Sequence, residues 1–144
     1  GLHWFCIGLH SFTLVCIGFA SACIGLHWFA FVCIGDLDYE PGSSKLGSGP
    51  FRSLKELADF MENQPAAEII LVGHTDNTGA SDANIALSKR RAASVVERLV
   101  AKYGIAAKRI TAQGVGFLAP LTANTDKSGR EQNRRVEAVI RRLQ

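Results

Sequence analysis

The alternation of apolar and polar positions predicts four strands in the C-terminal three quarters of the chain. One segment, AEIILVGHT at 67–75, contains a short continuous apolar run, which is typical of a strand covered on both faces or at the centre of a sheet. In another, Val136, Ala138 and Ile140 alternate with polar residues. The predicted strands lie at the start of 36–50, where alternation gives way to Gly, Ser and Pro, and at 67–75, 108–116 and 134–142.

Apolar residues at helical spacing predict two helices between these strands. The first covers 51–64 and ends before Pro65. The second covers 83–104, with an apolar stripe formed by Ala92, Val95, Val96, Leu99 and Tyr103. A polar loop with Pro120, Asn124 and Gly129 precedes the last strand. The order β-α-β-α-β-β predicts an α+β fold, a two-layer sandwich with both helices on one face of a mixed sheet.

Charge divides the chain into two unlike parts. Residues 1–35 contain no Lys, Arg, Asp or Glu, so all 16 basic and all 13 acidic residues lie in 36–144. We therefore expect a low-complexity leader at 1–35 and one folded domain at 36–144, long enough to bury a core. The net charge of +3 is mild and argues neither for nor against a polyanionic partner.

The leader repeats itself, because CIGLHSFTLVCIG (6–18) returns as CIGLHWFAFVCIG (23–35) with ten of thirteen positions identical. Four interpretations stay open. As a membrane anchor, the uncharged run 12–35 is long enough to cross a hydrocarbon core of about 30 Å. As a secretory or lipoprotein signal, FASAC (19–23) places small residues before Cys23, although the usual basic start is missing.

The third interpretation is a zinc site, since the leader holds thiol and imidazole ligands at Cys6, His10, Cys23 and His27. The repeat itself generates that spacing. The fourth is a segment foreign to the domain. All four cysteines lie in the leader, so the domain 36–144 has neither a disulfide framework nor thiol chemistry.

The stretch GHTDNTGASDANIALSKRRA, residues 73–92, gathers the polar chemistry of the domain. A metal site is disfavoured, because no Cys or Glu joins His74 and Asp76 in the loop. A phosphate loop would need a glycine-rich turn followed by Lys-Ser or Lys-Thr, which is absent. No spacing ties Ser81 or Ser88 to His74 as a nucleophile and its base.

Recognition of a small zwitterion is the functional interpretation that remains. Asp76 at the strand end can accept hydrogen bonds from an ammonium, and Arg91 can bind a carboxylate with two parallel hydrogen bonds. Helical spacing puts Arg91 at the border of the apolar stripe, one turn from Leu87 and from Val95. A purely structural alternative stays open, in which Asp76 pairs with Arg91 to brace the loop or caps local backbone amides.

Several fragments of this domain, taken in order and spacing, resemble the OmpA-like C-terminal domain. They are GHTDNTG (73–79), NIALSKRRA (84–92), ITAQGVG (110–116) and GREQNRRVE (129–137), with Pro120 and Asn124 between the last two. This family is the peptidoglycan-binding module of outer-membrane porin-type proteins, the peptidoglycan-associated lipoprotein and MotB-type flagellar stator proteins. The resemblance covers about 36–144 and implies a βαβαββ sandwich.

The resemblance also implies a ligand, the meso-diaminopimelate of the peptidoglycan stem peptide, which carries an amine and carboxylates. The aspartate and arginine that hold this group in the family fall on Asp76 and Arg91. The asparagine and leucine that line the groove fall on Asn84 and Leu87. The arginine of the NRR motif falls on Arg134, with Arg135 the less certain choice because adjacent strand residues face opposite ways.

The sequence thus predicts a non-enzymatic protein that binds peptidoglycan and tethers an envelope protein to the cell wall. It implies a periplasmic location beside the outer membrane, no cofactor, no metal and no nucleic-acid partner, and the anchor interpretation of residues 1–35 adds a membrane contact. The alternative is a stator-like or scaffold component of an envelope complex that uses the same fold. An envelope hydrolase would need a nucleophile and a base near the groove. The repeat at 1–35 resembles no part of the family.

Overall fold

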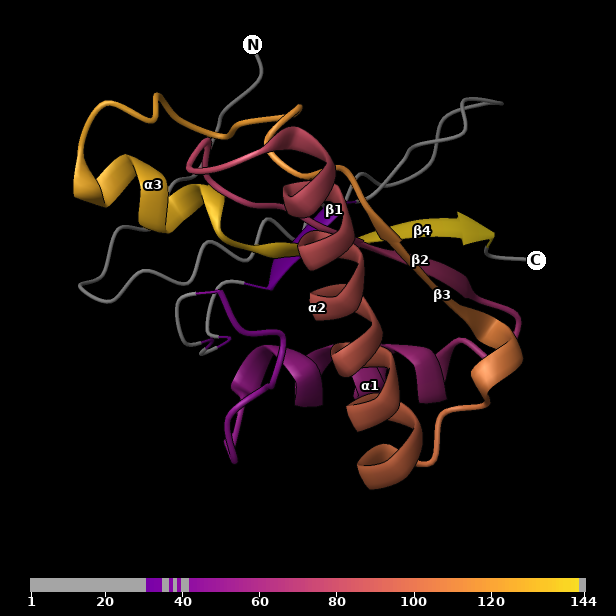
Figure 1. The fold of residues 1–144 in the computed structure, drawn as a ribbon. Helices are drawn as coiled ribbons and strands as arrows, with labels where there is room; N and C mark the ends of the chain where they lie inside the picture. Colours follow the sequence, from indigo (N-terminus) through magenta and orange to yellow (C-terminus); the bar gives the residue numbers. More distant parts are fainter. Residues whose placement is uncertain (1–30, 35–36, 38, 40–41, 143–144) are drawn as a thin grey trace, which may run out of the picture.

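One mixed sheet and the helices that pack on it make up the part of the chain that the computed structural model describes, residues 31–34, 37, 39 and 42–142 (Figure 1). The strands are β1 Phe31–Ile34, β2 Glu68–Gly73, β3 Ile110–Gly114 and β4 Val136–Arg142. The helices are α1 Arg52–Asn63, α2 Ser81–Tyr103 and α3 Lys127–Asn133, with a 3-10 turn η1 Ala107–Arg109 before β3.

The strands lie in the order β1-β4-β2-β3. Strands β2 and β3 are parallel, as expected for strands joined by a helix, whereas β4 is antiparallel to both β1 and β2. The apolar run of β2 therefore occupies a central strand. Ile69 and Leu71 are buried on the helix side and alternate with half-buried Ile70 and Val72 on the other. The predicted α+β sandwich with a mixed sheet is confirmed.

A single hydrophobic core joins the two long helices to the sheet. The expected stripe of α2 is found, with Ala92, Val95 and Leu99 fully buried, and α2 ends at Gly104, whose φ of +69° suits a residue without a side chain. Helix α1 packs against α2 and adds its own stripe to the same cluster, so both helices cover one face. That stripe consists of Leu54, Leu57, Ala58 and Met61.

The first strand is not where the alternation predicted it. It lies at Phe31–Ile34, inside the repeat assigned to the leader, and pairs with β4. Within 36–50 the described residues form only an isolated bridge between Tyr39 and Leu46. The strand lies here because Ile34 is fully buried in the core. A lack of charged residues is typical of a buried strand as well as of a low-complexity segment, so charge could not distinguish the two.

Helix α3 lies where the sequence predicted only a loop. It is seven residues long, and Asp126 caps its start by accepting a hydrogen bond from the Gly129 backbone N at 2.7 Å. Its buried residues are Gly129 and Asn133, so it has no apolar stripe for a periodicity argument to find. The last strand consequently begins at Val136 and not at Arg134, which is the C-cap of α3.

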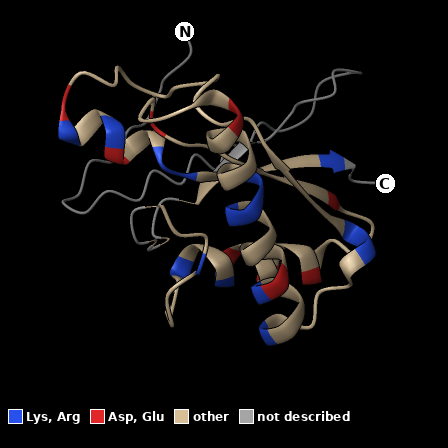
Figure 2. Cartoon of the chain, in the orientation of Figure 1, with Lys and Arg blue, Asp and Glu red and all other residues tan. Residues whose placement is uncertain are grey.

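The exposed faces of α1 and α3 carry both signs of charge (Figure 2). On α1, Arg52 pairs with Glu56 and Lys55 with Asp59, and on α3 Lys127 pairs with Glu131, each one turn apart. Such exposed pairs contribute little stability. The pairs place acidic side chains among the basic ones on both helices. The predicted absence of a nucleic-acid partner stays a prediction.

The interpretations of the leader fall almost wholly outside the described residues. The four predicted zinc ligands and the signal-like FASAC lie within 1–30. From residue 31 onward, as far as the structure describes the chain, no helix is long and apolar enough to cross a bilayer. The same residues contain no group of three His, Cys, Asp or Glu side chains that could hold a metal ion.

Candidate functional site

The loops of interest meet at one edge of the sheet. Gly73 ends β2 and pairs with Gly114 at the end of β3 on one side and with Val136 at the start of β4 on the other. Backbone hydrogen bonds from His74 to Arg135 and from Thr75 to Gly116 extend this pairing past the strand ends. The segments after β2, after β3 and before β4 therefore converge, at the carboxyl ends of parallel strands where α/β sheets commonly bind ligands.

Two glycines allow α2 to approach this edge. A Cβ on Gly73 would overlap the carbonyl of Ser88, and one on Gly114 would overlap the backbone N of Lys89. The Ser88 hydroxyl fills the remaining space, where it accepts a hydrogen bond from the Gly116 backbone N at 2.9 Å. This close contact places the first turns of α2 beside the loop that follows β2.

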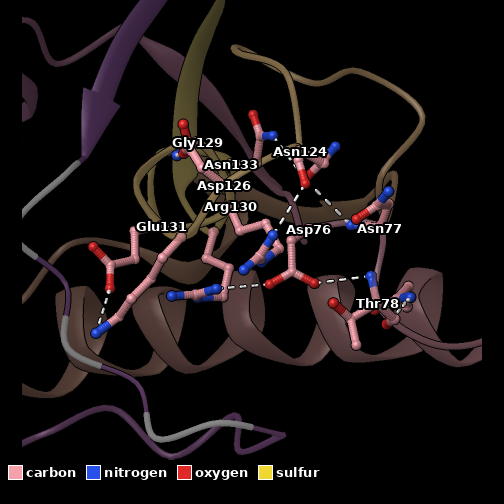
Figure 3. Close-up of polar contacts among 12 residues, drawn as sticks. Asp76, Asn77, Thr78, Asn124, Asp126, Gly129, Arg130, Glu131 and Asn133 are labelled. Carbon is pink, nitrogen blue, oxygen red and sulfur yellow. Dashed lines mark hydrogen bonds and ion pairs between the residues drawn. The ribbon is translucent and has the colours of Figure 1, made fainter.

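Asp76 is held from both sides by its two carboxylate oxygens. Oδ1 accepts a hydrogen bond from the Thr78 backbone N at 2.9 Å, and Oδ2 pairs with Arg134 Nη1 at 2.7 Å (Figure 3). Burial by itself would raise the pKa of Asp76, but the hydrogen bonds from Arg134 and Thr78 outweigh it and leave the pKa below its ordinary value. Asp76 is thus a fixed anion at neutral pH, with its side chain 13% exposed.

Three asparagines connect α3 to this loop, and the sequence patterns did not indicate them as a group. Asn133 is fully buried; its Oδ1 accepts hydrogen bonds from the Leu121 and Thr122 backbone N atoms, and its Nδ2 donates to Asn124 Oδ1. Asn124 Oδ1 also accepts a long hydrogen bond, 3.4 Å, from the Asn77 backbone N (Figure 3). The network braces the residue that follows Asp76.

Arg91 is buried, with 3% of its surface exposed. Its Nε donates a 2.9 Å hydrogen bond to the Ser43 carbonyl, and its guanidinium lies 5.0 Å from the centre of the Tyr39 ring. Among the described residues, Nη1 and Nη2 have no hydrogen-bond partner. Burial lowers the pKa of Arg91, as does the nearby charge of Arg134, while Tyr39 and Asp76 oppose the shift.

Asn84 and Leu87 lie on the same side of α2 as Arg91. Asn84 is buried and donates a 2.9 Å hydrogen bond from Nδ2 to the Thr78 carbonyl, so it holds the loop that carries Asp76. Leu87 is half-buried, between Asn84 and Arg91 along the helix. The spacing of these residues, three and then four positions, puts them on neighbouring turns.

The two arginines of the NRR motif are used differently. Arg134 is 36% exposed and pairs with Asp76, whereas Arg135 is 6% exposed and forms a 2.7 Å ion pair with Glu137. His74 Nε2 lies 3.4 Å from the other oxygen of Glu137, a contact too long for a good hydrogen bond. His74 and Arg135 together hold the pKa of Glu137 at about 2, against the effect of burial.

The geometry separates the open alternatives. Asp76 pairs with Arg134, so the bracing pair of Asp76 and Arg91 is not formed, although Asp76 does cap a local backbone amide. Arg91 donates from Nε to Ser43 and lies over the Tyr39 ring, whereas Asp76 acts on it through its charge. The contact with Tyr39 could not be found from sequence, because it joins residues 52 positions apart.

Comparisons with known proteins agree with this architecture. Porin F of Pseudomonas aeruginosa is 38% identical over 105 residues, which is 73% of this chain and 30% of the porin. The peptidoglycan-binding protein ArfA of Mycobacterium bovis is 40% identical over 90 residues, covering 62% of this chain and 27% of that protein. The crystal structure of the peptidoglycan-associated lipoprotein from Burkholderia pseudomallei matches with a TM-score of 0.65 and 26% identity, covering 73% and 88% of the two chains.

The chain spans about a third of the length of the first curated relatives that it matches. These relatives are porins and binding proteins and not enzymes, which agrees with the prediction of a non-enzymatic protein. The sequence profile of the OmpA family matches residues 39–134, the stretch that carries Asp76, Arg91 and Arg134. The chain therefore belongs to the OmpA family.

Proposed function

We propose that this chain binds peptidoglycan non-covalently and tethers an envelope protein to the cell wall from the periplasmic side. Two of the similar proteins carry peptidoglycan in their names, the binding protein ArfA and the peptidoglycan-associated lipoprotein. One relative is named an outer membrane porin and another a lipoprotein. Both names support an envelope location for this chain. A membrane contact through residues 1–35 remains a separate prediction.

The proposed ligand group is the zwitterionic end of diaminopimelate in the stem peptide. One observation carries this proposal: the buried guanidinium of Arg91 uses only Nε in a hydrogen bond, and the charge of Asp76 is near enough to act on its pKa. The carboxylate of the ligand would accept hydrogen bonds from Nη1 and Nη2. Its ammonium would donate to Asp76, which has lone pairs left beyond those used by Thr78 and Arg134.

The remaining predicted residues complete this arrangement. Arg134 is partly exposed and can contact a second carboxylate while it stays paired with Asp76. Leu87 offers an apolar surface between Asn84 and Arg91 for the methylene groups of the ligand. Asn84 fixes the loop through Thr78. Binding is charge-assisted hydrogen bonding to groups that are already in place, so little ordering entropy is lost.

The test is a calorimetric titration of the full chain with two stem peptides, one containing meso-diaminopimelate and one with lysine in its place. The lysine peptide keeps the side-chain ammonium and lacks only the adjacent carboxylate. We expect at least about tenfold weaker binding of the lysine peptide, because one charge-assisted pair of hydrogen bonds is missing. Equal affinity for both peptides would refute the proposed specificity.

Arg91→Lys tests the assigned residue in the same titration. Lysine keeps the charge but cannot form the planar two-bond contact, so the preference for the diaminopimelate peptide should shrink to a few-fold. Arg98→Lys is the matched control. Arg98 lies on the same helix and also binds backbone carbonyls, those of Gly47 and Ser48. A similar loss of preference in both variants would reduce Arg91 to a structural role.

A further inference from the structure

Tyr39 contacts Arg91 at two separate points. Its hydroxyl donates a 3.0 Å hydrogen bond to the backbone carbonyl of Arg91, and its ring lies under the guanidinium of the same residue. Burial raises the pKa of Tyr39, so the hydroxyl stays protonated and remains a donor at neutral pH. One side chain therefore fixes both the helix position of Arg91 and the plane of its head group.

A second contact fixes the rotation of that head group. The Nε atom of Arg91 donates to the carbonyl of Ser43, which belongs to the arm, defined here as residues 42–48. With Nε used and one face against Tyr39, only the edge formed by Nη1 and Nη2 remains for a ligand. A carboxylate can then bind end-on, through Nη1 and Nη2, and not side-on through Nε.

Arg98 shows what a purely structural arginine looks like at the same arm. It lies two turns after Arg91 on α2 and packs over the ring of Phe51, 5.8 Å from its centre. It uses both Nη atoms for the arm, donating to the carbonyls of Ser48 at 3.1 Å and Gly47 at 2.8 Å. The two arginines thus hold the same arm with opposite ends of the guanidinium, and only Arg91 keeps its Nη edge unused.

We propose that Tyr39 is a positioning residue, which together with the Ser43 carbonyl presents the Nη edge of Arg91 to the ligand carboxylate. The proposal rests on the function proposed above, because the carboxylate is that of the stem peptide. It adds that the specificity of the site depends on a residue that precedes α1, outside the loop that carries Asp76 and outside helix α2.

The first experiment needs no ligand and so is independent of the proposed function. Nitrogen-15 NMR of the full chain measures solvent exchange of the Arg91 Nε–H, with exposed Arg90 as the internal reference. We expect exchange at Arg91 to be at least about tenfold slower than at Arg90, and the protection to disappear in Tyr39→Leu. Tyr39→Phe, which keeps the ring, should retain most of it. Equal exchange at the two arginines, or full protection in Tyr39→Leu, would overturn the positioning role.

The second experiment combines the variants with the two stem peptides. In the wild type the lysine peptide should bind at least about tenfold more weakly than the diaminopimelate peptide. In Tyr39→Leu this ratio should fall to a few-fold, whereas in Tyr39→Phe it should stay near the wild-type value. A general loss of structure would weaken both peptides alike and leave the ratio unchanged, and that result would count against the proposal.

A control variant separates ring loss in general from ring loss at this position. Tyr103→Leu removes the ring of a half-buried tyrosine at the other end of α2 and should change neither the NMR signal nor the ratio. If the wild type binds neither peptide, the proposed function fails, and the exchange measurement still decides whether Tyr39 positions Arg91.

Discussion

Arg134 and Arg135 are adjacent in the chain but serve different carboxylates. Helix α3 ends at Asn133 with Arg134 as its C-cap, and β4 begins at Val136, so the two arginines lie in the short connection between helix and strand. Arg134 is partly exposed and pairs with Asp76, whereas Arg135 is buried and pairs with the partly exposed Glu137. A partly exposed pair can exchange partners with a ligand, while a buried pair is expensive to open. This difference supports the proposal that Arg134, and not Arg135, belongs to the binding site.

The pH dependence of stability should reveal the buried pair. The pKa of Glu137 is about 2 in the folded protein against 4.5 ordinarily, so its stabilisation is complete above pH 4.5 and is lost as the pH falls toward 2. We expect roughly 2 to 3 kcal/mol of unfolding free energy to disappear over that window in the wild type. Glu137→Gln should be less stable at pH 6 and show a flatter profile. Urea denaturation at several pH values measures both quantities.

Glu131→Gln, at an exposed residue of α3, is the control for removal of a carboxylate. It should keep the steep wild-type profile. If Glu137→Gln lost stability with falling pH as steeply as the wild type, the carboxylate held by His74 and Arg135 would not be the source of the effect.

At the scale of elements, the position of α2 on the sheet decides where the site residues lie. Gly73 and Gly114 pair across β2 and β3 and remove the two Cβ atoms that would collide with α2 at Ser88 and Lys89. This contact sets the height at which Arg91, one turn further along, lies above the strand ends. The glycines therefore allow close packing between α2 and the sheet, in addition to allowing the backbone path of the loop.

Gly73→Ala should push α2 away from the strand ends. The added Cβ meets backbone atoms of Ser88, which cannot move aside without the helix, so we expect a loss of about 1–3 kcal/mol in unfolding free energy. Stem-peptide binding should weaken as well. Gly42→Ala is the control: its Cβ meets nothing within 4 Å, and its φ of +71° adds only conformational strain of about 1 kcal/mol. A smaller effect at Gly73 than at Gly42 would contradict this account.

At the scale of the whole molecule, the sheet reaches into the uncharged repeat. Strand β1 covers the outer edge of β4, and Ile34 joins the core formed by α1, α2 and the sheet. The division by charge at residue 35 therefore passes through the end of a structural element. The domain expected at 36–144 lacks this strand, so the boundary can be tested by truncation.

Chains that begin at residue 31 and at residue 36 should differ in stability. Removal of 31–35 deletes β1 and exposes the space filled by Ile34, which is 0% exposed. We expect at least about 2 kcal/mol less unfolding free energy for the shorter chain, from the lost burial of this side chain alone. Thermal and urea unfolding measure the difference. Equal stability of the two chains would show that β1 is dispensable and restore the boundary at residue 36.

The sequence by itself determined the central strand and both long helices, because each rests on a pattern of apolar residues that burial imposes locally. It also indicated Asp76, Arg91 and Arg134, through their places in a recognisable set of fragments. It failed where the signal is not periodic. Helix α3 is too short and too polar, and β1 is apolar for the same reason that made 1–35 look like a separate leader.

Only the tertiary structure decided which residues of the candidate site contact one another. Asp76 takes Arg134 and not Arg91 as its partner, since the register of β2 and β4 brings the start of β4 to the end of β2. Arg91 meets Tyr39 because the segment before α1 folds onto α2. Such contacts join residues about fifty positions apart, and no local pattern encodes them. They arise from burial of one shared core, which fixes every element at once.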